Sequence, residues 1–481
     1  MSTEATPTRS GGTPGLRRLS ELPGPRRLPL LGQLGQFDMA QVHRAMEGWA
    51  RLHGPLFQVH FGPQPVLVVA DHEAVARLLR ERPERFGRSS RLREITLELG
   101  GVTGLFAAEG EAWRQQRKMV MSSFSPGQVR AYFPALLGVT QRLQSRWARA
   151  ARDGARIDLQ ADLKRFTVDA IAGLAFGTEV NTLESDADPI QRHLDLVLAG
   201  IFKRVMSPLP YWRWVRRAAD RELEQSMAAV QEAIGGFVAQ GRARLAADPA
   251  RRAQPPNLLE AMLVAAERGD AGVSERDVAG NVSTMLFAGE DTTANTLAWT
   301  IHLLHRHPPA LARASAEVRA LAPQTAAFTP EAMAALEYLE ACALEAMRLK
   351  PVAPFLGLEA LHDTEVEGVA VPAGGVIWCV LRHDSVDERH FPNPDAFEPG
   401  RWLAADAAAA SGKRVAMPFG SGPRICPGRY LALLEIKLAL AVLLANFEIE
   451  GVDTPDGREA AETMHFTMNP VGLSMRLRER G

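Results

Sequence analysis

The sequence predicts a mainly α-helical protein with small β-sheets at its periphery. From about residue 71 to residue 349, apolar residues recur with helical spacing, which places them on one face of successive turns. Strand-like runs are confined to residues 56–61, 65–69, about 356–380 and the tail 464–477, where β-branched and aromatic residues gather or alternate with polar ones. The tail is expected to form a final hairpin. Because helices greatly outnumber strands, we expect a large helical body around one long central helix.

The N-terminal region divides into a tail and the start of the body. Residues 1–21 are polar and rich in threonine, glycine and arginine, a composition typical of a disordered tail. Residues 22–481 contain no linker that would separate domains, so we expect one domain there. A helix is expected over about residues 39–52, and the alanine-rich stretch 404–413 is expected to be a surface connection.

Composition excludes several classes of protein. Lysine plus arginine number 55 and aspartate plus glutamate 56, for a net charge of −1, whereas a nucleic-acid binder usually carries a strongly basic face. Three scattered cysteines are too few for a disulfide framework and fit a reducing cytoplasm. The sequence has no signal-peptide pattern and no apolar run of the ~18 residues that span a bilayer. We therefore expect a cytoplasmic protein without a membrane anchor.

The long central helix is predicted from residue 274 to residue 307. Ser274 and Asp277 form a capping-box start, and two prolines follow His307. Thirty-odd residues make a helix of ~50 Å. Small residues at its middle, including Gly289, would let a flat ligand approach the backbone.

Two positions after this glycine come Asp291 and then Thr292, polar residues that are unfavourable in the middle of a helix. Such a local conflict often marks a functional site. The Thr292 hydroxyl can bond a carbonyl one turn earlier and open the helix to water. Asp291 could then feed protons through that hydroxyl. The alternative is a solvated helix face with incidental threonines.

A second motif, residues 419–428 (FGSGPRICPG), places Cys426 in a loop rich in glycine and proline. A thiolate is a strong ligand for soft metals. The helix expected from residue 429 to about 445 offers the positive end of its dipole, and Arg424 adds a fixed positive charge, both of which would lower the thiol pKa. The alternative for an isolated cysteine is a small buried apolar residue.

Two further motifs join basic residues to partners one turn away. Glu345 and Arg348 lie at i, i+3, and Arg401 could close a three-residue ion-pair network with them. Trp113 and Arg117 lie at i, i+4, where an indole N–H and a guanidinium make a receptor for a carboxylate. Taken alone, the first pair is more often a solvated surface pair, and the second is more often an ordinary amphipathic helix.

These four motifs, in this order, resemble the cytochrome P450 haem-thiolate monooxygenases from about residue 22 to residue 478. The resemblance implies the cytochrome P450 fold and a haem b cofactor, iron protoporphyrin IX, with Cys426 as the axial thiolate. It assigns Asp291 and Thr292 as the acid–alcohol pair that delivers protons to dioxygen. The cofactor-binding residues that it implies besides Cys426 are Trp113, Arg117, Gly289, Phe419, Gly420, Arg424 and Gly428.

The resemblance also assigns supporting residues. Glu345, Arg348 and Arg401 correspond to a structural triad. Substrate contacts are expected from Leu286, Phe287, Ala353, Phe355 and Phe466. Many family members carry an arginine for one haem propionate where this chain has Leu358, and Arg382 or His383 are candidates to replace it.

The function that the resemblance implies is insertion of one oxygen atom from O2 into a hydrophobic small molecule, by hydroxylation or epoxidation. Electrons would come from a separate ferredoxin or flavodoxin-type donor with an NAD(P)H reductase. A basic docking face for that donor would consist of Arg114, Lys118, Lys413 and Arg429. A peroxygenase or haem-thiolate isomerase is the alternative, which the acid–alcohol pair disfavours. A haem carrier or gas sensor without turnover is a third possibility.

Overall fold

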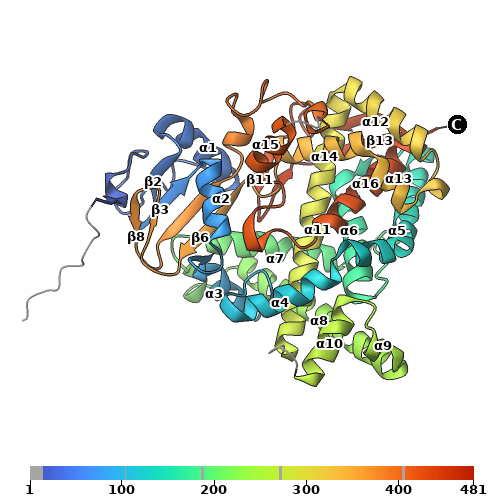
Figure 1. The fold of residues 1–481 in the computed structure, drawn as a ribbon, viewed down its shortest axis with the longest axis horizontal. Coiled ribbons are helices and arrows are strands. Elements are labelled where there is room, and N and C mark those ends of the chain that lie inside the picture. The colour runs from blue at the N-terminus through green and yellow to red at the C-terminus, as the bar shows by residue number, and fades with distance from the viewer. Residues whose placement is uncertain (1–14, 103, 186–188, 270–273, 404–406, 481) are drawn as a thin grey trace, which may run out of the picture.

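The computed structural model describes residues 15–102, 104–185, 189–269, 274–403 and 407–480, and Figure 1 shows helices clustered around one long helix beside a smaller sheet region. The helices are α1 (Val42–His53), α2 (His72–Arg80), α3 (Ser90–Glu98), α4 (Gly110–Ser123), α5 (Pro126–Arg152), α6 (Leu159–Phe176), α7 (Pro189–Val205), α8 (Ala218–Ala247), α9 (Ala250–Ala253), α10 (Leu258–Arg268), α11 (Glu275–Arg306), α12 (Pro308–Leu321), α13 (Pro330–Ala335), α14 (Glu337–Leu349), α15 (Ala407–Ala416) and α16 (Arg429–Asn446).

The strands form small sheets of two to five members. They are β1 (Arg17–Arg18), β2 (Leu56–Phe61), β3 (Gln64–Val69), β4 (Phe86–Arg88), β5 (Ile157–Asp158), β6 (Phe355–Ala360), β7 (Thr364–Val366), β8 (Val369–Val371), β9 (Val376–Val380), β10 (Phe447–Asp453), β11 (Glu462–Met464), β12 (Met468–Pro470) and β13 (Ser474–Glu479). The largest sheet has the order β2-β3-β9-β6-β4, with β3 and β9 parallel and its other neighbours antiparallel.

The predicted long helix is α11, which runs for 32 residues through the centre of the helical body (Figure 1). Its start is the predicted capping box: Ser274 accepts a hydrogen bond from the Asp277 N–H at 3.2 Å, and Asp277 accepts one from the Ser274 N–H at 2.8 Å. His307 caps its C-terminus, and the next residue is proline. α11 packs against α6, α14 and α16, so most of its C-terminal half is buried.

The tail of the chain pairs differently from the predicted hairpin. β11 and β12 do form an antiparallel pair, but β13 pairs with β10, which lies just after α16. The alanine-rich stretch beginning at residue 404 was expected to be a connection. Instead, residues 407–416 form α15, because alanine is the best helix former, while residues 404–406 lie outside the described residues.

The N-terminal segment is ordered earlier than the sequence predicted. Residues 1–14 of the predicted disordered tail lie outside the described residues. Arg17 and Arg18 form β1, which pairs in parallel with β8, and the next three residues form a short 3-10 helix. The backbone N–H and C=O groups of this segment hydrogen-bond to a neighbouring strand. The polar composition of the segment does not predict that pairing. Within the described residues, no helix has the length and apolar character needed to cross a membrane.

Candidate active site

The cysteine loop, residues 419–428, lies between α15 and α16 and contains the short 3-10 helix η8 (Gly422–Arg424). Gly422 has φ +73°, a left-handed conformation that favours glycine. A Cβ at Gly422 would lie 2.4 Å from the carbonyl oxygen of Leu79 in α2, so only glycine fits there. The Cys426 N–H donates to the Phe419 carbonyl oxygen at 3.0 Å, which closes the loop. Gly428 is the N-cap of α16, and Gly420 also has a positive φ, +76°.

The environment of Cys426 corrects the prediction that its surroundings favour the thiolate. Burial raises the pKa of the Cys426 thiol, and this outweighs the Gly428 N–H and the charges of Arg117 and Arg429, which lower it. The Arg424 guanidinium lies over the Trp113 ring and is not among the charges that lower the Cys426 pKa. The protein alone therefore keeps the thiol protonated, whereas coordination to a metal ion deprotonates a thiol.

A helix on the same side of the molecule presents both predicted carboxylate-binding residues to this loop. Trp113 and Arg117 lie on α4, and Trp113 is 6% exposed. Arg117 Nη2 donates to the Ile425 carbonyl oxygen, next to the cysteine, at 2.5 Å. The Arg424 guanidinium lies over the Trp113 ring, 4.7 Å from its centroid. The structure therefore brings Trp113 and Arg117 of α4 next to Arg424 in the cysteine loop.

Arg424 belongs to a group of three arginines, which we call the arginine cluster: Arg82, Arg88 and Arg424. Arg424 Nη2 donates to the Ala108 carbonyl oxygen at 2.6 Å and pairs with Glu109. Arg88 Nε donates to the Phe106 carbonyl oxygen at 2.7 Å. In the part of the chain that the structure describes, Arg82 Nε, Arg82 Nη2 and Arg424 Nε are buried without a hydrogen-bond partner.

The arginine cluster has more positive charge than its surroundings balance. Burial lowers the pKa of all three guanidiniums, that of Arg424 to about 10, and mutual repulsion lowers those of Arg88 and Arg424 further. Among the described residues, Glu109 is the one carboxylate that acts on these three pKa values in the opposite direction. Buried donors without acceptors and uncompensated charge together favour a bound anion.

The position of Leu358 has an arginine directly opposite it in the sheet. Leu358 is fully buried in β6, and its partner across the antiparallel pair with β4 is Arg88. The two candidates proposed from the sequence are engaged elsewhere. Arg382 pairs with Glu47 and Glu462 at 2.9 Å each, and His383 lies 4.0 Å from Asp384. The sequence did not identify Arg88, because its place opposite Leu358 depends on strand pairing over a separation of 270 residues in the chain.

One face of the middle of α11 is accessible to solvent, although the helix runs through the centre of the molecule. Ala288 is exposed, and Phe287, Gly289 and Thr292 are half-buried. Thr292 Oγ1 donates to the Ala288 carbonyl oxygen at 2.7 Å, the predicted bond one turn back, but the helix stays continuous rather than opening. A Cβ at Gly289 would lie 3.0 Å from Ile171 of α6, so this glycine allows the two helices to pack closely.

Asp291 faces away from the Thr292 hydroxyl, into a buried polar network that the sequence did not reveal. The side chain of Asp291 accepts hydrogen bonds from Asn295 at 2.9 Å and from Thr467, and it pairs with Lys164 of α6 at 3.0 Å. Lys164 also pairs with Asp195 of α7, whose side chain is 46% exposed. This chain of groups therefore connects the solvent with Asp291.

The charge state of Lys164 follows from its surroundings. Burial lowers its pKa, but the carboxylates of Asp291, Glu290 and Asp195 together raise it above its ordinary value. Lys164 is therefore a permanent ammonium at neutral pH, and it holds Asp291 in an ion pair. No motif in the sequence links residues 164 and 291, because the contact depends on the packing of α6 against α11.

The predicted Glu345–Arg348–Arg401 network is fully formed, with Glu345 and Arg348 buried and the Arg401 side chain 13% exposed; we call it the ion-pair network. Arg348 and Glu345 make two parallel hydrogen bonds of 2.8 Å, and Arg401 Nε donates to Glu345 at 2.9 Å. Trp402 Nε1 also donates to Glu345, at 2.8 Å. Arg348 in addition binds the carbonyl oxygens of residues 385, 394 and 396 at 2.6–2.9 Å. This network joins α14 to the chain that precedes the cysteine loop.

The five predicted substrate contacts differ in exposure. Phe287, Phe355 and Phe466 are half-buried and Ala353 is exposed, so each offers surface to a ligand. Leu286 is 0% exposed and belongs to the main core, so in this structure it faces protein rather than a ligand.

Comparison with known proteins gives a consistent result. The family model described as Cytochrome P450 matches residues 22–477. The chain is 29% identical to Cytochrome P450 27C1 of Danio rerio over 96% of this chain and 87% of the relative. It is also 29% identical to Cyclooctat-9-en-7-ol 5-monooxygenase of Streptomyces melanosporofaciens over 93% of both. The crystal structure of the cytochrome P450DA heme domain superimposes with a TM-score of 0.82 at 27% identity, covering 97% of this chain and 99% of that one.

Proposed function

Since the chain belongs to the cytochrome P450 family of oxidoreductases, we propose that it is a haem-thiolate monooxygenase, folded as one domain over residues 22–481. One oxygen atom of O2 enters a hydrophobic small molecule, and the other leaves as water. Haem, when bound, supplies the activation of O2 and accepts the electrons. The protein supplies an iron ligand, receptors for the cofactor carboxylates, an apolar substrate surface and protons.

The observation that carries this proposal is the arginine cluster beside the cysteine loop. Iron protoporphyrin IX, the haem b form, has two propionates and an iron that a thiolate can ligate. The cluster has unpaired buried donors and excess positive charge, and Cys426 lies two residues from Arg424. We propose that Cys426 ligates the iron and that Arg88 and Arg424, with Trp113 and Arg117, hold the propionates. Many family members carry a propionate-binding arginine at the position of Leu358, and in this chain Arg88 takes over that role.

We assign proton delivery to Asp291 and Thr292, with a longer route than the sequence suggested. Thr292 is half-buried on the open part of α11, where its hydroxyl can meet a small ligand. Asp291 is joined to solvent through Lys164 and Asp195. In this proposal Asp291 releases the Lys164 ammonium, turns toward Thr292 and passes on a proton that entered from the surface. Lys164 thus sets the position of Asp291 between turnovers.

Apolar groups near the site support a hydrophobic substrate. Phe106 and Phe466 have ring centroids 6.0 Å apart, and Phe355 packs at 5.8 Å against Trp378. Aromatic faces of this kind favour an apolar substrate. The Streptomyces relative is named as a monooxygenase of cyclooctat-9-en-7-ol, and we propose hydroxylation or epoxidation of a hydrophobic small molecule for this chain.

Electrons would come from a separate ferredoxin or flavodoxin-type donor served by an NAD(P)H reductase. Lys118 and Lys413 are exposed. Arg429 Nη1 donates to the Cys426 carbonyl oxygen at 3.2 Å, so this positive charge lies next to the proposed iron ligand. Arg114 contributes less, because Glu84 and Glu111 neutralise it at 2.6 and 3.0 Å. All three cysteines are free, and we propose a cytoplasmic location on that basis.

The experiment compares Thr292→Ala with Thr300→Ala in the haem-loaded enzyme, supplied with electrons by a ferredoxin and its reductase. Both hydroxyls donate to a carbonyl one turn earlier, at 2.7 Å, so loss of that bond is matched. Product formed per O2 consumed should fall by about tenfold or more in Thr292→Ala, with peroxide released instead, and should stay unchanged in Thr300→Ala. Equal product yields in the two variants, or turnover with peroxide alone, would favour the peroxygenase alternative.

A further inference from the structure

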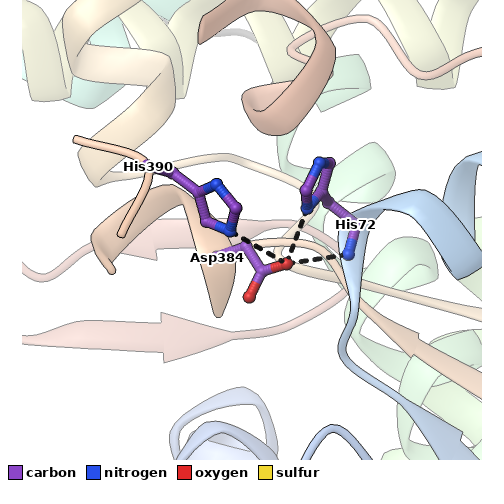
Figure 2. Close-up of side chains that lie close together, drawn as sticks. All are labelled: His72, Asp384 and His390. Carbon is purple, nitrogen blue, oxygen red and sulfur yellow. Dashed lines mark hydrogen bonds and ion pairs between the residues drawn. The ribbon is translucent and has the colours of Figure 1, made fainter. Parts of the chain in front are cut away.

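A group of three side chains far from the cysteine in sequence converges on one buried carboxylate. His72 is the first residue of α2, Asp384 begins the 3-10 helix η6 (Asp384–Val386), and His390 lies in the loop that follows. Figure 2 shows both imidazoles directed toward the Asp384 carboxylate. One nitrogen of each histidine and one carboxylate oxygen all lie within 4.8 Å of one another.

The contacts around one carboxylate oxygen, Asp384 Oδ2, have the character of a ligand set. It accepts hydrogen bonds from His72 Nδ1 and from the His72 N–H, each at 2.8 Å, and it lies 3.8 Å from His390 Nε2. The two imidazole rings are 4.7 Å apart and nearly perpendicular, at 75°. Their nitrogens can therefore approach one point without the rings colliding.

The other oxygen shows what the group lacks. Asp384 is 3% exposed, and its Oδ1 has no hydrogen-bond partner within the described residues. The nearest basic groups are Arg389, 3.6 Å away, and His383, 4.0 Å away, and burial lowers the pKa of His383, which favours its neutral form. Arg389 is 69% exposed and already makes two hydrogen bonds of 2.9 Å with Asp387. A buried carboxylate oxygen left in this state is costly unless a cation pairs with it.

We propose that His72, Asp384 and His390 bind a zinc ion. Two imidazole nitrogens and a carboxylate oxygen are ligands that zinc accepts, with a fourth position for water. Tetrahedral zinc with bonds of about 2.0–2.1 Å separates its ligand atoms by ~3.3 Å. The observed separations of 2.8 and 3.8 Å from Asp384 Oδ2 bracket that value, and the two imidazole nitrogens lie within 4.8 Å of each other. Binding therefore requires the two histidine side chains to shift toward a common point. The His72 and His390 side chains are 15% and 25% exposed, which leaves a way in for the ion and its water.

The position of the site gives zinc a structural consequence. The far end of α2 contacts the cysteine loop, because Leu79 lies against Gly422. On the other side, the residue after Asp384 is Ser385, whose carbonyl oxygen accepts from Arg348 at 2.7 Å. A zinc ion would therefore fasten α2 to the segment that the ion-pair network anchors. Zinc binding does not depend on the monooxygenase proposal, since none of its three ligands belongs to the haem site.

The test uses the full-length, haem-loaded protein, treated with a chelator, dialysed and titrated with zinc chloride in a calorimeter. Wild type should bind one zinc per chain at this site, and its melting temperature should rise with zinc. His390→Ala should weaken binding by about 100-fold or more, since loss of even an outer-sphere partner costs up to that factor. His362→Ala, which removes an exposed histidine outside the group, is the matched control and should bind as wild type does.

Asp384→Asn is the second variant, because it keeps the size of the side chain and an acceptor for the His72 N–H. It should also lose zinc binding, with circular dichroism and the haem absorption unchanged to show that it folds. Equal zinc affinity in wild type, His390→Ala and Asp384→Asn would overturn the proposal. So would the absence of binding to chelator-treated wild type, in which case the group is a hydrogen-bonded start of α2 and nothing more.

Discussion

Two buried arginine-rich regions of this molecule differ in how completely their charge is balanced. In the ion-pair network, Glu345 accepts hydrogen bonds from Arg348, Arg401 and Trp402, and the remaining Arg348 donors bind backbone carbonyls. In the arginine cluster, Glu109 pairs with Arg424 and is the one carboxylate among the described residues that raises the pKa of all three guanidiniums. Three donors of Arg82 and Arg424 have no hydrogen-bond partner among the described residues.

The difference separates a structural role from a binding role. A saturated buried network has nothing left to offer a ligand, and removing one member leaves a charge buried alone. An unsaturated cluster holds buried positive charge without enough acceptors, which is unfavourable until an anion binds. Such a cluster is therefore suited to bind an anion. The ion-pair network therefore holds the chain around the cysteine loop, and the arginine cluster is suited to hold the carboxylates of a cofactor.

The largest change in stability is expected from breaking the ion-pair network. Glu345→Gln leaves Arg348 buried without its counter-charge, and we expect a loss of about 3–5 kcal/mol in the free energy of unfolding. Urea denaturation of the haem-loaded protein measures this. Arg77→Ala, which breaks an exposed pair with Glu367 at 2.6 Å, is the control and should cost less than about 1 kcal/mol. Similar costs for the two variants would remove the distinction between a buried network and a surface pair.

Removing a charge from the arginine cluster should not lower the stability of the haem-free chain. In the haem-free chain, Arg88→Met removes a repelling charge and should leave the free energy of unfolding unchanged or raise it by about 1 kcal/mol. The same variant should bind haem about tenfold or more weakly, because one charge-assisted hydrogen bond is lost. Haem titration and urea denaturation report the two quantities. Arg348→Met is the matched substitution in the ion-pair network, and a similar loss of haem-free stability in both variants would contradict the comparison.

The smallest effect is a pH dependence of the free energy of unfolding, which only the ion-pair network should contribute. Burial alone would raise the pKa of Glu345, but the hydrogen bonds and charge of Arg348 lower it below its ordinary value. Its contribution is therefore fully present above the unfolded-state pKa of about 4.3 and is lost as the pH falls through the lower folded-state pKa.

Urea denaturation between pH 6 and pH 3, buffer values chosen to bracket about 4.3, checks this dependence. Arg401→Met should show a shallower loss of stability with acid than wild type, because Arg401 is one of the charges that lower the Glu345 pKa. A steeper loss in Arg401→Met would show that another carboxylate sets the acid sensitivity.

Local patterns in the sequence were enough to predict much of the fold. The capping box at Ser274 and the prolines after His307 set the bounds of α11 to within a residue. β2 has the predicted bounds Leu56–Phe61, because its ends are marked by turn residues. The i, i+3 and i, i+4 motifs place Glu345 with Arg348, and Trp113 with Arg117, on single helices, so their geometry depends mainly on helical spacing.

Contacts between distant parts of the chain could not be predicted in the same way. Arg88 lies opposite Leu358 through strand pairing, and Lys164 reaches Asp291 through helix packing. Neither contact leaves a local signal in the sequence. The direction of the Cys426 pKa was predicted wrongly for a related reason: the helix start and nearby charges can be read from the sequence, whereas the extent of burial cannot.

The central claim, that Cys426 is the thiolate ligand of a haem iron, is tested most directly by one absorption spectrum. Reduced, haem-loaded wild type exposed to carbon monoxide should show the strongly red-shifted band typical of thiolate ligation. Cys379→Ala, which removes a fully buried cysteine of β9, should keep that band, and Cys426→Ala should lose it. A spectrum typical of histidine ligation in wild type, or a thiolate band that persists in Cys426→Ala, would contradict the account.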